Sequence, residues 1–184
     1  MEKIISEAKE RMTKAVTALQ DEFNTLRTGR ASPALFDKIR VEYYGNPTPL
    51  NQVATISAPE ARLVVIQPWD KSIIGDIEKA IQKSELSVNP SNDGKVIRIS
   101  IPPLTEERRK EFVKIAKNMA EQNRVSIRNT RRDANDELKK AEKDGTISED
   151  DLKRAEDEVQ KLTDQYIEKI NELLGSKEQE ILEV

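Results

Sequence analysis

The clearest hydrophobic pattern in the chain lies in a run free of proline and glycine from Thr105 to about Lys143. Its apolar side chains recur at spacings of one, three, four or seven residues, which at about 100° per residue places them on one arc of a helix. Thr105 is a natural N-cap, and Gly145 stands where a C-terminal cap is expected. The pattern predicts one long helix that packs along the arc formed by Phe112, Ala116, Met119, Ala120, Ile127, Ala134, Leu138 and Ala141.

Two further stretches carry similar stripes. One runs from about Glu2 to Arg27, and the other begins after a cap at Ser148. Three stripes of near-heptad spacing predict an elongated, coiled-coil-like three-helix bundle that runs up-down-up and is formed by residues 1–29 and 105–184. The inward positions are expected to be Ile5, Met12, Leu19 and Leu26 in the first helix, and Leu152, Ala155, Val159, Leu162, Tyr166, Ile170 and Leu173 in the third.

The segment between the first two helices, residues 31–104, has a different pattern. Alternating and β-branched runs predict strands, and proline-rich stretches are interpreted as turns. Trp69 is interpreted as a packing residue. The chain is therefore predicted to be an α+β protein, in which a small, β-rich α+β domain is inserted into the bundle. Strands are expected over 38–44, 53–58, 62–67 and 95–101, a short amphipathic helix over 72–84, and turns over 45–49 and 89–94.

Two short connections, residues 28–32 and 101–105, join the inserted domain to the bundle. The first contains a glycine, which adds backbone freedom, and the second is stiffened by two prolines. Two such connections between rigid bodies are typical of a hinge. The hinge residues are expected to be Gly29, Arg30, Ala31, Pro102 and Pro103.

Composition excludes several classes of function. The chain has no Cys and no His, which removes thiol catalysis, the commonest general base and the commonest metal ligand. Neither a glycine-rich phosphate loop nor a nucleophile elbow is visible, so we expect no enzyme activity, no metal and no cofactor. No apolar run approaches the roughly 20 residues that span a bilayer. We therefore expect a cytoplasmic protein that does not bind a membrane.

The net charge of −3 conceals an uneven distribution. Residues 105–132 carry nine basic and four acidic side chains, whereas residues 133–184 carry eight basic and seventeen acidic ones. The distribution of charge, rather than its mean, decides where a polyanion can bind. A basic segment inside an acidic protein therefore allows nucleic acid as a partner.

The basic segment contains four arginines that fall beside the apolar arc of its helix, with Asn135 one turn further. Arginine binds phosphate oxygens through a planar fork of N–H groups. A row of such side chains on a stiff helix indicates a nucleic-acid backbone as partner. The alternative is a solvated charged face, which is disfavoured because few acidic residues lie at i+4 to pair with these arginines. The four are Arg124, Arg128, Arg131 and Arg132.

Five strings of the sequence resemble the bacterial ribosome recycling factor family. They occur in order and cover essentially the whole chain: LRTGRASP at 26–33, VEYYGNPTPL at 41–50, PPLTEERRK at 102–110, VSIRNTRRDAN at 125–135 and VQKLTD at 159–164. The resemblance implies a two-domain, L-shaped, monomeric protein that binds ribosomes after termination. Together with elongation factor G and its GTP hydrolysis, such a factor promotes dissociation of the ribosome into subunits and release of messenger RNA.

The resemblance also implies where the partners bind. In this family the bundle lies on ribosomal RNA of the large subunit at the intersubunit face, and the smaller domain faces elongation factor G. Carried onto the matching positions, the RNA-contacting role falls to Arg128, Arg131 and Arg132, and also to Arg27, Arg109 and Arg124.

Two alternatives come from other classes of protein. A helical adaptor, binding RNA or protein without enzymatic activity, would also use a charged bundle, and a protein-binding one would tolerate arginine substitutions. An enzyme of RNA or nucleotide chemistry would need converging carboxylates or a metal site, which the sequence does not offer.

Overall fold

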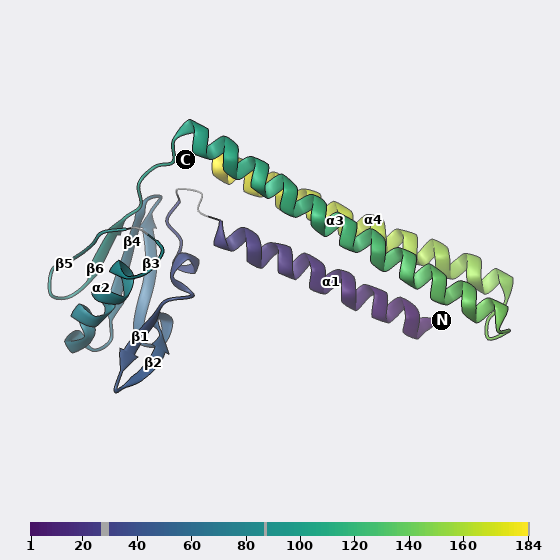
Figure 1. The fold of residues 1–184 in the computed structure, drawn as a ribbon, viewed down its shortest axis with the longest axis horizontal. Coiled ribbons are helices and arrows are strands. Elements are labelled where there is room, and N and C mark those ends of the chain that lie inside the picture. Colours follow the sequence, from purple (N-terminus) through teal and green to yellow (C-terminus); the bar gives the residue numbers. More distant parts are fainter. Residues whose placement is uncertain (27–29, 87, 184) are drawn as a thin grey trace. The chain divides into compact units, whose positions relative to one another are not determined.

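A computed structural model describes residues 1–26, 30–86 and 88–183, and the chain divides into two compact units. Unit 1 comprises Met1–Phe23 and Glu111–Gln179, and unit 2 comprises Asn24–Lys110 and Glu180–Val184. The predicted α+β class is confirmed, because long helices are combined with a small antiparallel sheet (Figure 1). Arg27 and Gly29, named above as RNA-contacting and hinge residues, lie outside the described residues.

Unit 1 is built from three long helices, α1 (Glu2–Thr25), α3 (Glu106–Lys143) and α4 (Glu149–Leu182), and successive helices run in opposite directions (Figure 1). Their ends are specified locally. The Thr105 side chain accepts the Arg108 N–H at 3.2 Å, as predicted for an N-cap. Gly145 adopts a φ of 75°, and its N–H donates to the Glu142 carbonyl at 3.0 Å, which closes α3.

The start of α4 is a capping box. The Ser148 hydroxyl accepts the Asp151 N–H at 3.1 Å, and the Asp151 carboxylate accepts the Ser148 N–H at 3.4 Å. Such reciprocal bonds satisfy two backbone donors that have no partner inside the helix. From this cap α4 continues through Gly175 to Leu182 without a break.

The core of unit 1 contains many small side chains. Ala8 of α1, Ala134 of α3 and Ala155 of α4 pack in one cluster with Ile5, Leu138 and Val159. Small residues let helix backbones approach closely, and large ones such as Met12 and Ile170 are fully buried between them. The predicted stripe of α4 is only approximate, because Thr163 is buried in place of Leu162, and Lys177 and Ile181 are buried beyond its predicted end. Several predicted inward residues are only half-buried: Leu26, which lies beyond the end of α1, and Phe112, Met119, Ala141, Leu152, Leu162 and Leu173.

Unit 2 contains a four-stranded antiparallel sheet in the order β3-β4-β6-β5 and a separate two-stranded ribbon, β1-β2. The sheet strands are β3 (Ala54–Glu60), β4 (Leu63–Pro68), β5 (Pro90–Asn92) and β6 (Ile97–Ser100), and the ribbon strands are β1 (Arg40–Tyr43) and β2 (Asn46–Pro49). Helix α2 (Ile74–Gln82) and three short 3-10 turns, Pro33–Phe36, Leu50–Gln52 and Lys71–Ile73, complete the unit.

Alternation along the central strands produces the core of unit 2. Val64 and Ile66 of β4 and Ile97 and Ile99 of β6 are fully buried, and their neighbours in sequence point to the opposite face. Helix α2 contributes its own apolar stripe to the same cluster. The remaining members of this core are Ala31, Phe36, Ile39, Val41, Leu50, Val53, Ala54, Ile73, Ile77 and Ile81.

Both proline-rich stretches that we interpreted as turns contain strands. Only Tyr44 and Gly45 form the first turn, with φ values of 50° and 77°, as in a tight type I′ hairpin. Asn46–Pro49 then pairs with β1, and Pro90–Asn92 pairs with β6. Proline lacks the N–H that an interior strand requires, but β2 and β5 are each paired on one side only, where proline is tolerated.

The interpretation of Trp69 as a packing residue was also wrong. The side chain is 65% exposed, and its indole N–H donates to the Thr55 hydroxyl at 2.9 Å. Trp69 directly follows β4, whose inward positions are 64, 66 and 68, so the alternation of the strand directs residue 69 outward.

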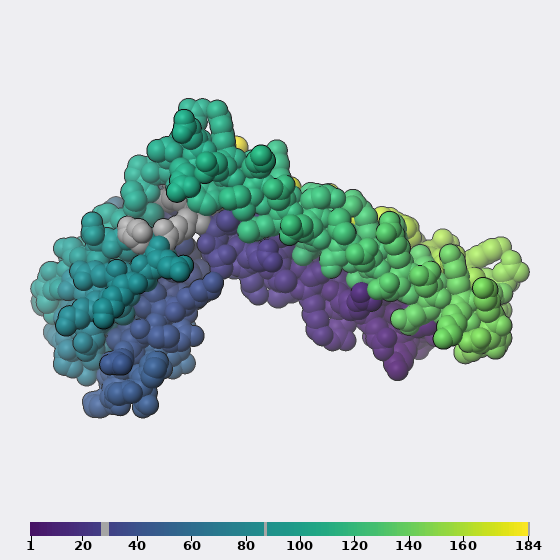
Figure 2. All heavy atoms as spheres, viewed as in Figure 1, coloured from purple at the N-terminus to yellow at the C-terminus, as the bar shows by residue number. Residues whose placement is uncertain are grey.

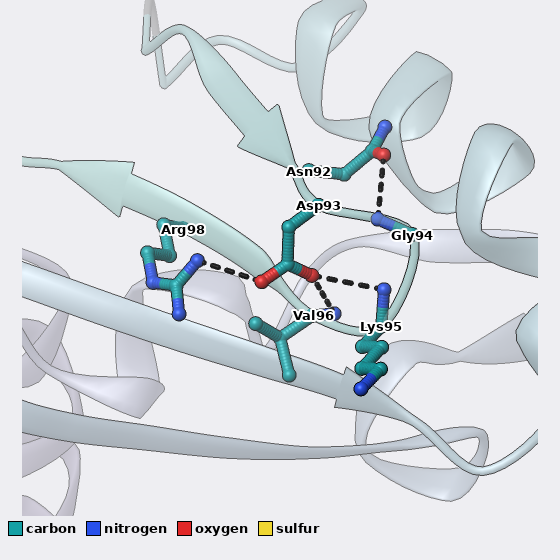
Figure 3. Close-up of polar contacts among 6 residues, drawn as sticks. All are labelled: Asn92, Asp93, Gly94, Lys95, Val96 and Arg98. Atoms are coloured by element: carbon teal, nitrogen blue, oxygen red, sulfur yellow. Dashed lines mark hydrogen bonds and ion pairs between the residues drawn. The ribbon is translucent and has the colours of Figure 1, made fainter.

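The turn between β5 and β6 is organised by one carboxylate (Figure 3). Asp93 accepts the N–H groups of Lys95 and Val96, both at 2.9 Å, and the Arg98 guanidinium at 2.9 Å. Bonds from Val96, Lys95 and Arg98 hold the pKa of Asp93 well below its ordinary value, because they stabilise the charged form.

Candidate nucleic-acid interface

The four predicted arginines of α3 lie along the flank of the helix that meets α4, and we call Arg124, Arg128, Arg131 and Arg132 the arginine stripe. Two of them bond to α4 directly: Arg124 to Asn171 and Arg131 to Gln160. The helix positions the other two on neighbouring turns of the same flank. One uninterrupted helix therefore holds four guanidinium groups in a row.

Arg124 is the most firmly held member of the stripe. Its Nε donates to Asn171 Oδ1 at 3.0 Å, and its Nη1 donates to Glu121 Oε2 at 2.8 Å. The side chain is only 18% exposed. Two of its three guanidinium nitrogens are thus bonded within the protein, and the bond to Asn171 links α3 to α4.

Arg128 shares the same carboxylate but is more open to solvent. Its Nη1 donates to Glu121 Oε1 at 3.1 Å, and the side chain is 39% exposed. Within the described residues, Nε and Nη2 of Arg128 make no further hydrogen bond. This edge of the guanidinium carries two parallel N–H donors, the geometry that binds two oxygens of a phosphate.

Arg131 and Arg132 are the least engaged members. Among the described residues, the Arg131 side chain makes one hydrogen bond, a long one from Nη1 to Gln160 Oε1 at 3.4 Å. The Arg132 side chain is exposed and makes no hydrogen bond or ion pair to any other described residue. The cationic charge that a ligand can reach is therefore greatest at the end of the stripe formed by Arg128, Arg131 and Arg132.

Glu121 is the residue that sequence reasoning missed. It was expected that few acidic side chains would pair with these arginines, because only the i+4 spacing was considered. Glu121 stands three residues before Arg124 and seven before Arg128, and it binds both. Hydrogen bonds from Arg124 and then Arg128 lower the pKa of Glu121 from its ordinary value. Glutamate at i−3 of the first arginine is a signal that the sequence already contained.

Arg109, another predicted site residue, lies apart from the stripe, whereas Asn135 follows it one turn beyond Arg131. Arg109 is half-buried in the first turn of α3, about 22 Å along the helix from Arg124 at 1.5 Å per residue. Its Nε is buried without a hydrogen bond to any described residue. Asn135 is half-buried, and its side-chain oxygen likewise has no described partner.

The expected hinge residues differ in their surroundings. Ala31 belongs to the core of unit 2, and its N–H donates to the Ala61 carbonyl at 2.6 Å. Arg30 is exposed, as are Pro102 and Pro103. The N–H of Ile101, just before the prolines, donates to the Arg62 carbonyl at 2.8 Å. Both connections are thus attached to the β3–β4 turn where they enter and leave unit 2.

Neither a metal centre nor a membrane segment emerges from the part of the chain that the structure describes. No group of three or more acidic side chains there is arranged to hold a metal ion. None of its helices is long and apolar enough to cross a bilayer.

The chain matches known proteins over nearly its whole length. A family model described as ribosome recycling factor matches residues 19–182. A ribosome-recycling factor of Treponema denticola is 64% identical over 183 residues, which cover 100% of this chain and 99% of that protein. One of Halalkalibacterium halodurans is 62% identical over 181 residues, which cover 98% of each.

Solved structures give the same result. A solution structure of the ribosome recycling factor superposes with a TM-score of 0.81 at 49% identity, covering 100% of this chain and 97% of that one. A second neighbour, with a TM-score of 0.70 at 50% identity and 98% coverage of each chain, is the T. thermophilus ribosome recycling factor. It is described with E. coli elongation factor G bound to the E. coli post-termination complex. Sequence and fold thus agree, and the chain belongs to the ribosome recycling factor family.

Proposed function

We propose that this chain binds the post-termination ribosome and, with elongation factor G and GTP, promotes its dissociation into subunits and the release of messenger RNA. Membership of the family supports this activity. The structural neighbour bound with elongation factor G to a post-termination complex supports the choice of partners.

The docking surface that we propose is the arginine stripe, and its ligand is ribosomal RNA of the large subunit at the intersubunit face. The observation that carries this assignment is the open edge of Arg128 beside Arg131 and Arg132 on one helix. Folded RNA is recognised mainly by shape and phosphate position, for which guanidinium groups on a rigid support are suited. Arg109 and Arg27 are secondary candidates for RNA contact, and Arg124 mainly supports its neighbours.

The bundle and the inserted domain have different roles in this proposal. The bundle, residues 1–29 and 105–184, anchors on RNA, and the inserted domain, residues 31–104, meets elongation factor G. The connections at 28–32 and 101–105, with Gly29, Arg30, Ala31, Pro102 and Pro103, act as the hinge. The chain itself breaks no bond and needs no cofactor, because elongation factor G supplies the GTP hydrolysis. It acts as a monomer in the cytoplasm.

A subunit-splitting assay by light scattering tests the proposal. Purified chain with elongation factor G and GTP should split post-termination ribosomes, and either factor alone should split far fewer. Failure of the complete mixture would contradict the recycling activity.

Charge reversal tests the docking surface. Arg131→Glu with Arg132→Glu should leave helical circular dichroism nearly unchanged and weaken ribosome binding at least tenfold, because two phosphate contacts become repulsive. The matched control is Lys153→Glu with Lys161→Glu, the same change of charge on exposed positions of α4. Equal binding by the two double variants would exclude the stripe as the RNA-binding surface and favour a protein-binding adaptor.

A further inference from the structure

Glu121 bridges the two arginines with both of its carboxylate oxygens, one to each guanidinium, at 2.8 and 3.1 Å. Arg124 is in turn fixed to α4 through Asn171. A chain of contacts therefore leads from Asn171 through Arg124 and Glu121 to Arg128. Glu121 thus sets the position of the Arg128 guanidinium, and Glu121 is itself held by the anchored Arg124.

The bridge leaves the phosphate-binding edge of Arg128 open. Glu121 uses Nη1, whereas Nε and Nη2 make no hydrogen bond within the described residues. A long, flexible side chain such as arginine loses rotamer freedom when it is fixed at an interface. A guanidinium that is already held in the free protein loses less conformational entropy when it binds.

The same carboxylate also has an opposite effect. It adds one negative charge to a surface that must attract a polyanion, so it weakens the long-range attraction that any RNA experiences. Glu121 is 53% exposed in its side chain, so its pairs with arginine contribute little to folding stability. Its two effects on binding, pre-orientation of Arg128 and reduction of net charge, thus have opposite signs.

We propose that Glu121 is a specificity-determining residue of the RNA-binding surface. Its carboxylate positions the Arg128 guanidinium for a phosphate that lies at a defined place on the ribosome, and its charge disfavours loose binding to other RNA. Binding to the ribosomal site gains affinity from the fixed orientation of Arg128. Binding to other RNA is affected only by the negative charge of Glu121. The inference rests on the proposed docking of the arginine stripe on ribosomal RNA.

Glu121→Gln separates the two effects. Glutamine keeps the size and helix propensity of the side chain, but its single amide oxygen cannot replace a carboxylate that accepts from both arginines. The probes are 70S ribosomes and a generic RNA duplex of about 20 base pairs, each measured over a series of salt concentrations. The matched control is Glu10→Gln on α1, an exposed glutamate whose partner is Lys14 at 2.7 Å.

We expect Glu121→Gln to lower the ratio of ribosome affinity to duplex affinity. Binding to the duplex should become about three- to fivefold tighter near 0.15 M salt, as expected for the loss of one negative charge. Ribosomes gain from the same loss of charge but lose the positioned guanidinium, so the ratio should fall about two- to tenfold, the range for immobilising one long side chain at an interface. Glu10→Gln should change neither affinity by more than about twofold.

A double-mutant cycle with Arg128→Gln completes the test. In that background Glu121→Gln should no longer lower the ratio of ribosome affinity to duplex affinity, because no guanidinium is left to position. An unchanged or higher ratio for the single variant Glu121→Gln, or persistence of its fall without Arg128, would overturn the inference. The proposed function fails separately, if the charge reversal at Arg131 and Arg132 leaves ribosome binding intact.

Discussion

Arg124 and Arg132 are the same residue type on the same helix, yet the structure places them in different roles. Arg124 has two nitrogens engaged and is 18% exposed, whereas Arg132 is exposed and unpaired among the described residues. Sequence reasoning grouped them because their spacing along α3 is helical. It could not separate them, because the partners of Arg124 include Asn171, which lies 47 residues away in the sequence.

This difference predicts unequal effects on stability. Arg124→Gln should lower the free energy of unfolding by about 1–3 kcal/mol, since it removes the charge-assisted hydrogen bond to Asn171 that joins α3 to α4. Arg132→Gln should change it by less than about 0.5 kcal/mol, as is usual for an exposed side chain without partners. Urea unfolding followed by circular dichroism measures both. Similar losses for the two variants would show that Arg124 does not support the bundle.

At the scale of elements, the helices were predictable because their signals are local. Thr105, Gly145 and Ser148 each form the cap that their sequence context indicates. Strands β2 and β5 were missed because their prolines resemble turns, and proline at these positions is acceptable only because each strand has a single neighbour. That condition depends on tertiary pairing, which no local pattern contains.

The β5–β6 turn predicts a pH-dependent element. The pKa of Asp93 is lowered in the folded protein, so its charged form contributes stability above the unfolded pKa, and this stability is lost as pH falls through the folded value. Asp93→Asn should therefore lower Tm most near pH 7, and the difference from the parent should shrink from about pH 4 downward. Thermal unfolding at pH 3, 4, 5 and 7 measures this, with Asp76→Asn, an exposed carboxylate of α2, as control. A difference in Tm that stays constant with pH would show that the bonds of Asp93 do not depend on its charge.

At the scale of the whole molecule, the two-part organisation followed from a change of hydrophobic period, from helical in the flanking stretches to alternating between them. The division of contacts runs within α3, between Lys110 and Glu111, rather than at the helix start. The predicted connections also prove to be partly fixed, since Ala31 and Ile101 bond to the turn between β3 and β4. We therefore expect these two residues to stay in place in any hinge motion.

The prolines after Ile101 provide the test of this connection. Pro102→Gly with Pro103→Gly removes the restriction on φ at two exposed positions without touching either core or the arginine stripe. Because the proposed RNA contacts lie on the bundle, ribosome binding should stay within about twofold, whereas force transmitted through a looser joint should be less effective. We therefore expect the rate of subunit splitting with elongation factor G and GTP to fall several-fold at saturating factor. Pro47→Gly, an exposed proline of β2, is the matched control and should split at the parental rate. Equal losses of binding and splitting in the double variant would mean that the prolines serve the fold of the chain rather than transmission between its parts.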